Sequence, residues 1–179
     1  MTNVAIQGIK GSYSEEAAMQ LMGESAIMIE CLDFAETFEQ AKNGADFAVV
    51  PIRNTIVGEI ESTRQLLARS GLKILDALDL DIRHVLAGAT NAKFSDVVSV
   101  TSHTEALKQC GKFFNSNPQI SARTGTDTAS SIRRIATANV ISEAAIGSRR
   151  AAEIYGARIL RERIADDANN RTTFFLIGK

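Results

Sequence analysis

The sequence predicts an α/β protein with layered, largely parallel sheets, and three observations support this fold class. Short apolar runs at residues 4–9, 47–50 and 97–100 read as buried strands. Segments with helical spacing follow these runs and often stop at a glycine. The alternation starts again near residue 79, which favours two lobes over a single sheet.

Capping residues and breakers define the elements of the first part of the chain. A helix is expected over residues 14–22, and Asp33 is a suitable N-cap for a second helix over 34–43. Pro51 is expected to end the strand at 47–50, because proline cannot donate to a strand ladder. Helical spacing at residues 60–69 and two extended runs within residues 72–86 complete this part.

The second part repeats this order and supplies the domain boundaries. The expected elements are a strand at 97–100, a helix at 104–114, a strand near 120, a helix at 128–136, a strand at 144–146, a helix at 148–155, an extended pair at 159–160 and a strand at 172–177. We expect the last strand to return to the first lobe. Lobe 1 then comprises residues 1–77 plus 159–179, and lobe 2 comprises residues 78–158.

Composition limits the partners of this chain. The net charge is −1 and the isoelectric point is near 6.1, so no overall field favours nucleic acid or an anionic membrane. No stretch approaches the roughly 20 apolar residues that span a bilayer, and the N-terminus lacks a signal-peptide pattern. Cys31 and Cys110 are expected to be buried free thiols, with a disulfide between them as the alternative, and no Cys/His cluster has metal-ligand spacing. We therefore expect a cytoplasmic protein without a metal.

Five junctions join an apolar run to a helical segment through small hydroxyl, amide or glycine residues. A helix start exposes unpaired N–H groups and the positive end of a dipole, so it can hold an anion. Several such starts at one edge of parallel sheets would line a cleft for a small, multiply anionic molecule. The junctions are residues 11–14, 54–55, 102–104, 126–128 and 147–148.

These junctions carry motifs that resemble the prephenate dehydratase family. Residues 51–55, Pro-Ile-Arg-Asn-Thr, resemble the family's Pro-Ile-Glu-Asn-Ser/Thr segment. Residues 102–110 are similar to its Ser-His-Pro-x-Ala-Leu-x-Gln-Cys segment, and residues 170–174 to its Asn-x-Thr-Arg-Phe segment. Further matches lie at residues 11–18, 127–129 and 144–156. The segments occur in family order across nearly the whole chain, so together they are much more specific than any one alone.

The resemblance implies two Rossmann-like lobes, as in type II periplasmic binding proteins, with the active site in the cleft between them. It implies the conversion of prephenate to phenylpyruvate, water and carbon dioxide in phenylalanine biosynthesis, without a cofactor. The chain ends directly after the last catalytic-domain strand, so we expect neither an ACT regulatory domain nor a chorismate mutase domain. Prephenate is the expected small-molecule partner, and a homodimer is the preferred assembly.

The resemblance also assigns roles to individual residues. Thr172 would interact with the departing ring hydroxyl as a positioned donor or proton relay, because threonine does not titrate near neutral pH. Asn54, Ser102 and Gln109 would supply neutral hydrogen bonds that orient the ring. The N-terminus of the first helix would receive a carboxylate. The candidates for substrate binding are Ser12, Tyr13, Ser14, Arg53, Thr55, Thr128, Arg171, Thr173 and Phe174.

Two positions depart from the family pattern. Arg53 stands where the family has glutamate, and Thr173 stands where it has arginine, which would remove a cation from the cleft. Alternate residues of a strand share a face, so Arg171 and Thr173 point the same way and Thr172 points the opposite way. Arg171 could therefore reach the vacated region, or Arg53 could supply the lost cation. The alternative for Arg53 is a solvated loop position.

Other residues also have plain structural explanations. Arg171 would equally pair with Asp166 or Asp167 at the surface. Ser102 is a suitable N-cap for the helix that begins at residue 104. His84 directly precedes the apolar run at residues 85–87, which is typical of a core histidine with a satisfied ring.

Three functions remain open on sequence grounds. The first is an active prephenate dehydratase, which Thr172, Asn54 and Gln109 favour. The second is a relative that decarboxylates prephenate without dehydration, which Arg53 and Thr173 favour. The third is a non-catalytic module that binds an aromatic or dicarboxylate ligand.

Overall fold

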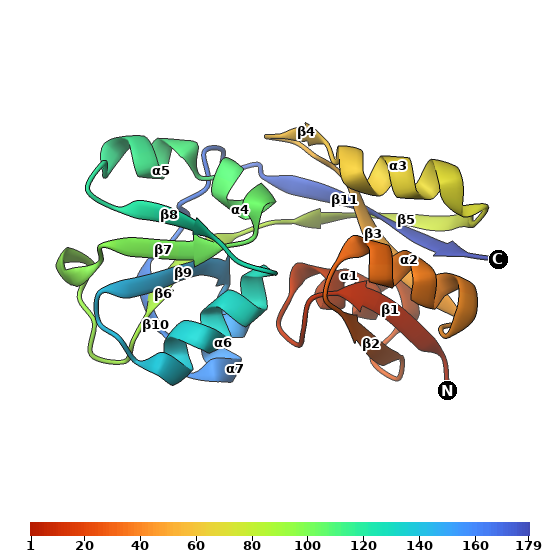
Figure 1. Ribbon diagram of the computed structural model, residues 1–179, viewed down its shortest axis with the longest axis horizontal. Coiled ribbons are helices and arrows are strands. Elements are labelled where there is room, and N and C mark those ends of the chain that lie inside the picture. Colours follow the sequence, from red (N-terminus) through yellow and green to blue (C-terminus); the bar gives the residue numbers. More distant parts are fainter. The chain divides into compact units, whose positions relative to one another are not determined.

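The computed structural model describes residues 1–179, which form two compact units (Figure 1). The first unit comprises residues 1–9, 13–81 and 171–179, and the second comprises residues 10–12 and 82–170. The chain therefore passes between the units four times, after residues 9, 12, 81 and 170. These boundaries differ from the expected ones, because residues 78–81 continue a strand of the first sheet and residues 158–161 pair within the second.

Helices and strands alternate through most of both units. The first unit contains β1 (Asn3–Gln7), α1 (Tyr13–Met22), β2 (Ile27–Cys31), α2 (Phe34–Asn43), β3 (Phe47–Asn54), β4 (Gly58–Glu59), α3 (Glu61–Ser70), β5 (Lys73–Asp81) and β11 (Arg171–Gly178). The second contains β6 (His84–Gly88), the short 3₁₀ helix η1 (Phe94–Asp96), β7 (Ser99–Ser102), α4 (Thr104–Lys108), α5 (Gly111–Ser116), β8 (Ser121–Thr124), α6 (Thr128–Ala138), β9 (Glu143–Ser148), α7 (Arg149–Tyr155) and β10 (Arg158–Arg161).

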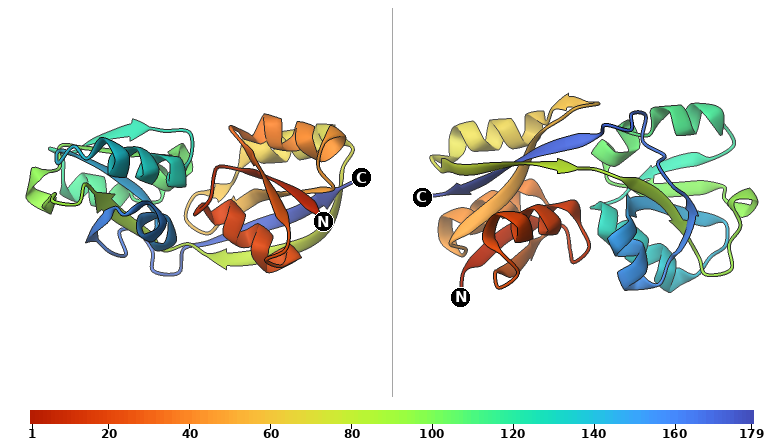
Figure 2. Two further views of the ribbon diagram at one scale, coloured as in Figure 1. Left: turned by 90° about the horizontal axis from the view of Figure 1, so that it is seen from below. Right: turned by 180° about the vertical axis from the view of Figure 1, so that it is seen from behind.

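The sheet of the first unit is mixed rather than largely parallel. Its strand order is β2-β1-β3-β11-β5, and β4 pairs with the end of β3. Strand β1 runs parallel to β2 and β3, whereas β11 runs antiparallel to both β3 and β5. Figures 1 and 2 show β11, in blue, alongside β5. The parallel pairs are joined through helices, as parallel strands require, whereas β11 returns from the second unit and is free to enter antiparallel.

Side-chain alternation divides the core of this unit between two faces. Helices α2 and α3 contact each other, and their side chains Phe38 and Leu67 belong to the apolar cluster around Val50. Because neighbouring residues of a strand point to opposite faces, Val49 and Phe174 point away from that cluster. Helix α1 contacts β1, β3, β5 and β11, and we place it on this second face.

Strand β3 continues through Pro51, contrary to the sequence prediction. Strand β1 pairs with β3 only as far as Val49, and the ladder between β3 and β11 shifts register between Thr173 and Phe174. The register pairs Thr173 with Arg53 and Phe174 with Pro51, which leaves one extra residue on β3. Proline is tolerated at such a bulge because the regular ladder is already interrupted.

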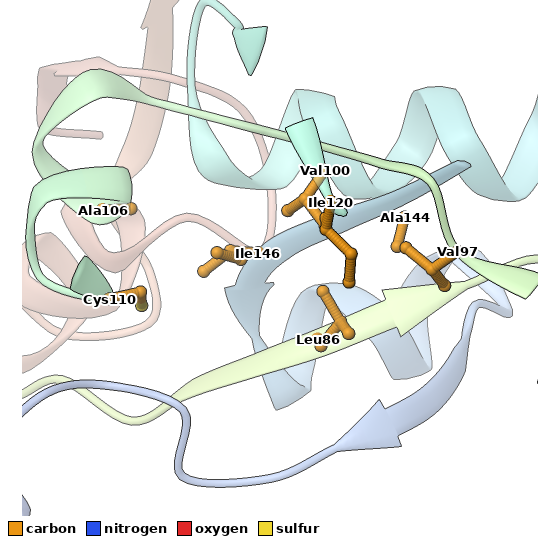
Figure 3. Close-up of a cluster of buried hydrophobic side chains, with 8 residues drawn as sticks. All are labelled: Leu86, Val97, Val100, Ala106, Cys110, Ile120, Ala144 and Ile146. Carbon is orange, nitrogen blue, oxygen red and sulfur yellow. The ribbon is translucent and has the colours of Figure 1, made fainter. Parts of the chain in front are cut away.

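The sheet of the second unit has the strand order β10-β6-β9-β7-β8. Helices α4 and α5 lie on one side of it and α6 and α7 on the other (Figure 1). Figure 3 shows the apolar cluster on the α4 side, where Leu86, Val100 and Ile146 from three neighbouring strands meet Ala106 and Cys110. Strand β7 runs parallel to β8 and β9, whereas β6 runs antiparallel to β9 and β10. This sheet is therefore also mixed.

The helix expected over residues 104–114 is interrupted at Gln109 and Cys110. The backbone N–H of Asp166 donates to the carbonyl oxygen of Gln109 at 2.7 Å. The Asp166 carboxylate accepts from the backbone N–H of Lys112, in the first turn of α5, at 2.7 Å. The 162–170 segment thus provides hydrogen-bond partners for backbone groups that would bond to each other in a continuous helix. The Asp166 carboxylate also serves as an acceptor at the N-terminus of α5.

Residues 10–12 belong to the second unit although both flanking segments belong to the first. Ser148 Oγ donates to the Gly11 carbonyl at 2.7 Å, and the Tyr155 hydroxyl donates to the Lys10 carbonyl at 2.8 Å. Gly11 has a φ of +90°, and a Cβ there would lie 3.0 Å from the Ala151 Cα. Only glycine fits both the backbone conformation and the close approach to α7.

The remaining sequence expectations concern thiols and membrane segments. Cys31 and Cys110 are both free and buried, and burial raises the pKa of the Cys110 thiol to about 12. No helix has the length and apolar character needed to cross a membrane.

Two buried threonines in helices provide a matched test of how polar groups contribute to stability. Thr63 and Thr37 are both fully buried, but Thr63 Oγ1 has no partner whereas Thr37 Oγ1 donates to the Asp33 carbonyl at 2.8 Å. We expect Thr63→Val to raise the free energy of unfolding by about 1–2 kcal/mol, since it removes an unsatisfied hydroxyl. Thr37→Val should lower it by a similar amount. Urea unfolding of both variants measures the difference, and equal shifts would contradict this account.

Candidate active site

Asn54 and Thr172 form a buried polar pair in the first unit. They face each other across the ladder between the end of β3 and the start of β11. Asn54 Nδ2 donates to Thr172 Oγ1 at 2.9 Å, and the two residues are 1% and 5% exposed. The pairing follows from the antiparallel entry of β11, which places the last residues of β3 opposite its first residues.

The carboxamide of Asn54 is fixed at both ends. Its Oδ1 accepts from the backbone N–H groups of Ile56 and Val57 at 2.9 and 3.2 Å. Its Nδ2 donates to the Arg171 carbonyl at 3.1 Å as well as to Thr172. A side-chain amide with two acceptors at its nitrogen and two donors at its oxygen has one satisfied orientation.

Thr172 is therefore held as a hydrogen-bond donor. Its oxygen already accepts from Asn54, and no group of the protein accepts the proton of its own hydroxyl. Accepting one hydrogen bond polarises a hydroxyl and strengthens the bond that it donates. A buried donor without an acceptor is costly, so this hydroxyl is suited to a ligand oxygen.

Arg53 and Thr173 lie on the opposite face of the sheet from this pair. They are paired with each other across the ladder, one residue away from Asn54 and Thr172 on each strand. Both line a hollow of about 480 Å³, together with Ile52, Glu59, Arg64, Leu67, Ala68 and Phe175. Thr173 Oγ1 donates to Asp79 Oδ1 at 2.6 Å. The two departures from the family pattern thus change a cross-strand pair on the α3 side, and neither residue contacts the Thr172 hydroxyl.

Arg171 also points away from the Thr172 face and forms a surface ion pair. Its Nε lies 3.0 Å from Asp81 Oδ1 on β5, with both side chains about half exposed. Its partner is therefore neither Asp166 nor Asp167. The exposed Thr55 forms two hydrogen bonds with the Arg171 backbone. Thr55 Oγ1 accepts from the Arg171 N–H, and the Thr55 N–H donates to the Arg171 carbonyl, both at 2.9 Å. Thr55 and Arg171 thus hold β11 against β3, and exposed ion pairs of this kind contribute roughly 0–1 kcal/mol.

Gln109 is the centre of a second buried polar group, in the second unit. Its Oε1 lies 2.8 Å from His84 Nε2 and 2.9 Å from Asn170 Nδ2. All three residues are at most 5% exposed. Strand alternation places His84 on the same face of the sheet as Leu86, which is the face that α4 covers. Gln109 lies at the break after α4, where the Asp166 N–H holds its backbone carbonyl.

His84 and His103 are both kept neutral by burial. Loss of hydration lowers the pKa of His84 from its usual 6.5 to about 4, and the bond to Gln109 opposes this shift. Burial also lowers the pKa of His103. His103 is the N-cap of α4, where its Nδ1 accepts from the Glu105 N–H at 3.3 Å. Ser102 therefore does not cap this helix, contrary to the sequence-based alternative.

The other predicted hydroxyl and helix-start residues have mainly structural partners. Ser102 is fully buried and donates to the Ile146 carbonyl at 2.7 Å, which ties β7 to β9. Thr128 is the half-buried first residue of α6, whose N-cap Asp127 accepts from the Ser130 N–H at 2.7 Å. Ser148 caps α7 through the Ala151 N–H at 2.9 Å.

The residues around the start of α1 fall in both units. Ser12 belongs to the second unit, whereas Tyr13 and Ser14 open the ten-residue helix α1 in the first. Ser12 and Ser14 are buried, and Tyr13 is half-buried. Phe174 is 2% exposed and contributes to the core.

Two members of the buried polar groups were missed as functional candidates. Asn170 is the first residue of the segment that resembles the family's Asn-x-Thr-Arg-Phe motif, and that position was an available signal. His84 was interpreted as a core histidine, which its burial supports, but nothing in its apolar surroundings indicated that its partner would be Gln109.

The low pKa of His84 makes stability depend on pH. The unfolded state takes up a proton near pH 6.5 and the folded state only near pH 4, so acidification between these values favours unfolding. We expect the protein to lose on the order of 3 kcal/mol through His84 over this range, since one pKa unit corresponds to about 1.4 kcal/mol. Urea unfolding at several pH values checks this. The His84→Gln variant should show a shallower pH slope, and an unchanged slope would contradict the assignment.

Comparison with curated proteins identifies relatives along nearly the whole chain. A family model described as prephenate dehydratase matches residues 4–179. The chain is 36% identical over 177 residues to arogenate dehydratase/prephenate dehydratase 1, chloroplastic, of Arabidopsis thaliana. It is 34% identical over 180 residues to the bifunctional chorismate mutase/prephenate dehydratase of Escherichia coli K12. These matches cover 98% of this chain but 45% and 47% of the relatives, so the chain spans about half of their length.

Solved structures show the same fold. A prephenate dehydratase from Arthrobacter aurescens, solved in complex with L-Phe, superposes with a TM-score of 0.85 and 28% identity, over 99% of this chain and 60% of that one. GqqA, described as a quorum-quenching acylase, gives a TM-score of 0.79 and 25% identity, over 99% and 64%. The periplasmic VFT2 domain of Bordetella pertussis BvgS shares the fold alone, with a TM-score of 0.55 and 15% identity. That match covers 99% of this chain and 79% of the VFT2 chain. The predicted fold class is confirmed, and the chain belongs to the prephenate dehydratase family.

Proposed function

We propose that this chain catalyses the decarboxylating dehydration of prephenate to phenylpyruvate, water and carbon dioxide. Its family and the activities for which its relatives are named support the proposal. The observation that carries it is the Thr172 hydroxyl, which accepts from Asn54 and has no acceptor for its own proton. A hydroxyl prepared in this way can donate to the oxygen that leaves the substrate ring.

The reaction consumes one proton. The prephenate dianion loses carbon dioxide from its ring carboxylate, and the electron pair of the broken C–C bond enters the ring. The ring hydroxyl leaves from the opposite carbon and takes up a proton to become water, which gives the phenylpyruvate anion. Because an aromatic ring forms, no oxidant, reductant or cofactor is needed. The protein has to hold the dianion in position and assist the departing hydroxyl.

Thr172 assists by donating a hydrogen bond to the leaving oxygen. Its own pKa is too high for it to act as a free acid near neutral pH, so its proton must be replaced as it is given, or remain shared. The Asn54 amide keeps the Thr172 oxygen in an accepting role, which directs its proton toward the substrate. This hydrogen bond strengthens as negative charge develops on the leaving oxygen, and such differential binding lowers the barrier.

The two substrate carboxylates need separate donors. The start of α1 offers Ser14 and backbone N–H groups at the positive end of a ten-residue helix. Gln109 offers a buried carboxamide nitrogen without a partner in the protein. In the chain, Arg171 alone separates Asn170, which contacts Gln109, from Thr172.

We also propose a cytoplasmic location and a homodimeric assembly. The two free, buried cysteines suit a reducing compartment. Sedimentation of the purified protein tests the assembly directly.

Product analysis distinguishes the proposed activity from its alternatives. Purified protein incubated with prephenate should release phenylpyruvate and one equivalent of carbon dioxide. A non-aromatic decarboxylated product would identify a prephenate decarboxylase instead. Binding without turnover would identify a ligand-binding module. Arogenate belongs in the same assay because the Arabidopsis relative is named for both substrates.

Thr172 and Thr173 provide a matched pair of variants, since they are neighbours on opposite faces of β11. Thr172→Val keeps the volume but removes the hydroxyl, and we expect it to lower kcat roughly a hundredfold or more. Thr172→Ser should retain much of the activity. Thr173→Val should change kcat only slightly, because Thr173 contacts Asp79 at the surface. Steady-state kinetics with circular dichroism as a folding control measure these effects. Activity near wild type in Thr172→Val would remove this hydroxyl from the mechanism.

A further inference from the structure

The two ends of the Gln109 carboxamide have very different surroundings. Its oxygen has two close partners, His84 Nε2 at 2.8 Å and Asn170 Nδ2 at 2.9 Å. Its nitrogen has none in the protein, although the residue is only 5% exposed. A carboxamide has two acceptor sites on its oxygen and two donors on its nitrogen. The acceptor end of Gln109 is thus filled and its donor end is open.

We propose that His84 and Asn170 are positioning residues that orient the Gln109 amide so that its N–H groups face the substrate. This inference rests on the proposed function, because it assigns the open N–H groups to a carboxylate or carbonyl oxygen of prephenate. His84 and Asn170 themselves act only through Gln109.

The orientation matters because an amide presents opposite charge at its two ends. Rotated by 180°, Gln109 would present its oxygen to an anionic substrate and repel it. The same rotation would place its NH₂ group against the N–H of His84 and the NH₂ of Asn170, so donors would face each other in place of the two hydrogen bonds. Unsatisfied buried donors are costly, so His84 and Asn170 together select one orientation.

The surrounding fold holds each member of this group. His84 is fixed by its place in β6, which pairs with β9. Asn170 is fixed through its backbone carbonyl, which accepts from the Ile82 N–H at 2.8 Å. Gln109 is fixed by the helix break, where its own carbonyl accepts from Asp166. Burial lowers the pKa of His84 to about 4, so the neutral ring carries one N–H, which we assign to Nε2, where it donates to Gln109 Oε1.

The histidine tautomer tests this arrangement without any substrate. Nitrogen-15 NMR of the wild-type protein between about pH 5.5 and 8 distinguishes a protonated Nε2 from a protonated Nδ1. A protonated Nε2 on His84 is the expected result. A proton on Nδ1 would mean that Nε2 accepts from the Gln109 NH₂ group, and it would overturn the proposal. This measurement decides the matter even if the protein does not turn over prephenate, an outcome that would refute only the proposed function.

Substitutions test whether the effect passes through Gln109. His84→Leu removes the donor, whereas His84→Gln places an amide N–H at a similar reach. Asn170→Asp replaces a donor with a carboxylate that can only accept, so it favours the rotated amide. We expect His84→Leu and Asn170→Asp each to lower kcat/KM about tenfold to a hundredfold, and His84→Gln to recover most of the loss.

Double variants in a Gln109→Leu background show whether His84 and Asn170 act through Gln109 or only support the fold. If His84 and Asn170 act through Gln109, adding His84→Leu or Asn170→Asp to Gln109→Leu should lower kcat/KM no further. Thermal unfolding of each variant separates loss of fold from loss of orientation. Effects that multiply in the double variants, or a His84→Gln variant as impaired as His84→Leu, would overturn the inference. Asn170→Asp keeps the test informative should His84→Leu fail to fold.

Discussion

The position of β11 determines where the Thr172 hydroxyl and its partner Asn54 lie. The strand enters antiparallel between β3 and β5, so its first residues meet the last residues of β3. That register pairs Thr172 with Asn54 on one face and Thr173 with Arg53 on the other. A shift by one residue would exchange the two faces, because side chains alternate along a strand. The apolar anchors Phe174, Leu176 and Ile177, all buried, hold the register.

Both buried polar groups follow the same physical design. In each, a carboxamide is satisfied on its acceptor side by donors of the protein, two backbone N–H groups for Asn54 and two side chains for Gln109. In each, a donor is left open, the Thr172 hydroxyl in the first unit and the Gln109 nitrogen in the second. Neutral groups of this kind recognise an anion without placing a titrating charge beside it, and their orientation does not depend on pH in the neutral range.

Local patterns in the sequence predict the parts of this structure that local interactions control. Asp33, Asp127 and Ser148 cap helices as their residue types and positions indicate. The family motifs, which are short and contiguous, single out Asn54, Gln109 and Thr172, and all three side chains are buried and hydrogen-bonded in the structure. Most of the strand and helix alternation follows from apolar spacing in the same way.

The sequence-based predictions fail where contacts between residues far apart in the chain determine the local structure. Pro51 does not end β3, because the bulge opposite β11 removes the need for its N–H. The helix breaks at Gln109 because Asp166, more than fifty residues later, supplies the missing hydrogen bonds. The ion pair of Arg171 with Asp81 and the position of Arg53 on the α3 face could not be predicted locally, because both depend on the register of β11 and on the position of β5. None of these contacts can be predicted from the residue types of the neighbouring sequence.

The discontinuous first unit also constrains the order in which the chain can fold during synthesis. Strand β5 pairs with no strand other than β11, which follows the whole second unit in the sequence. Until residues 171–178 leave the ribosome, β5 and the outer edge of β3 remain without their neighbour, while the second sheet is already complete in sequence. Until then the nascent chain carries open strand edges at β3 and β5, the state in which strands most readily pair with the wrong partner.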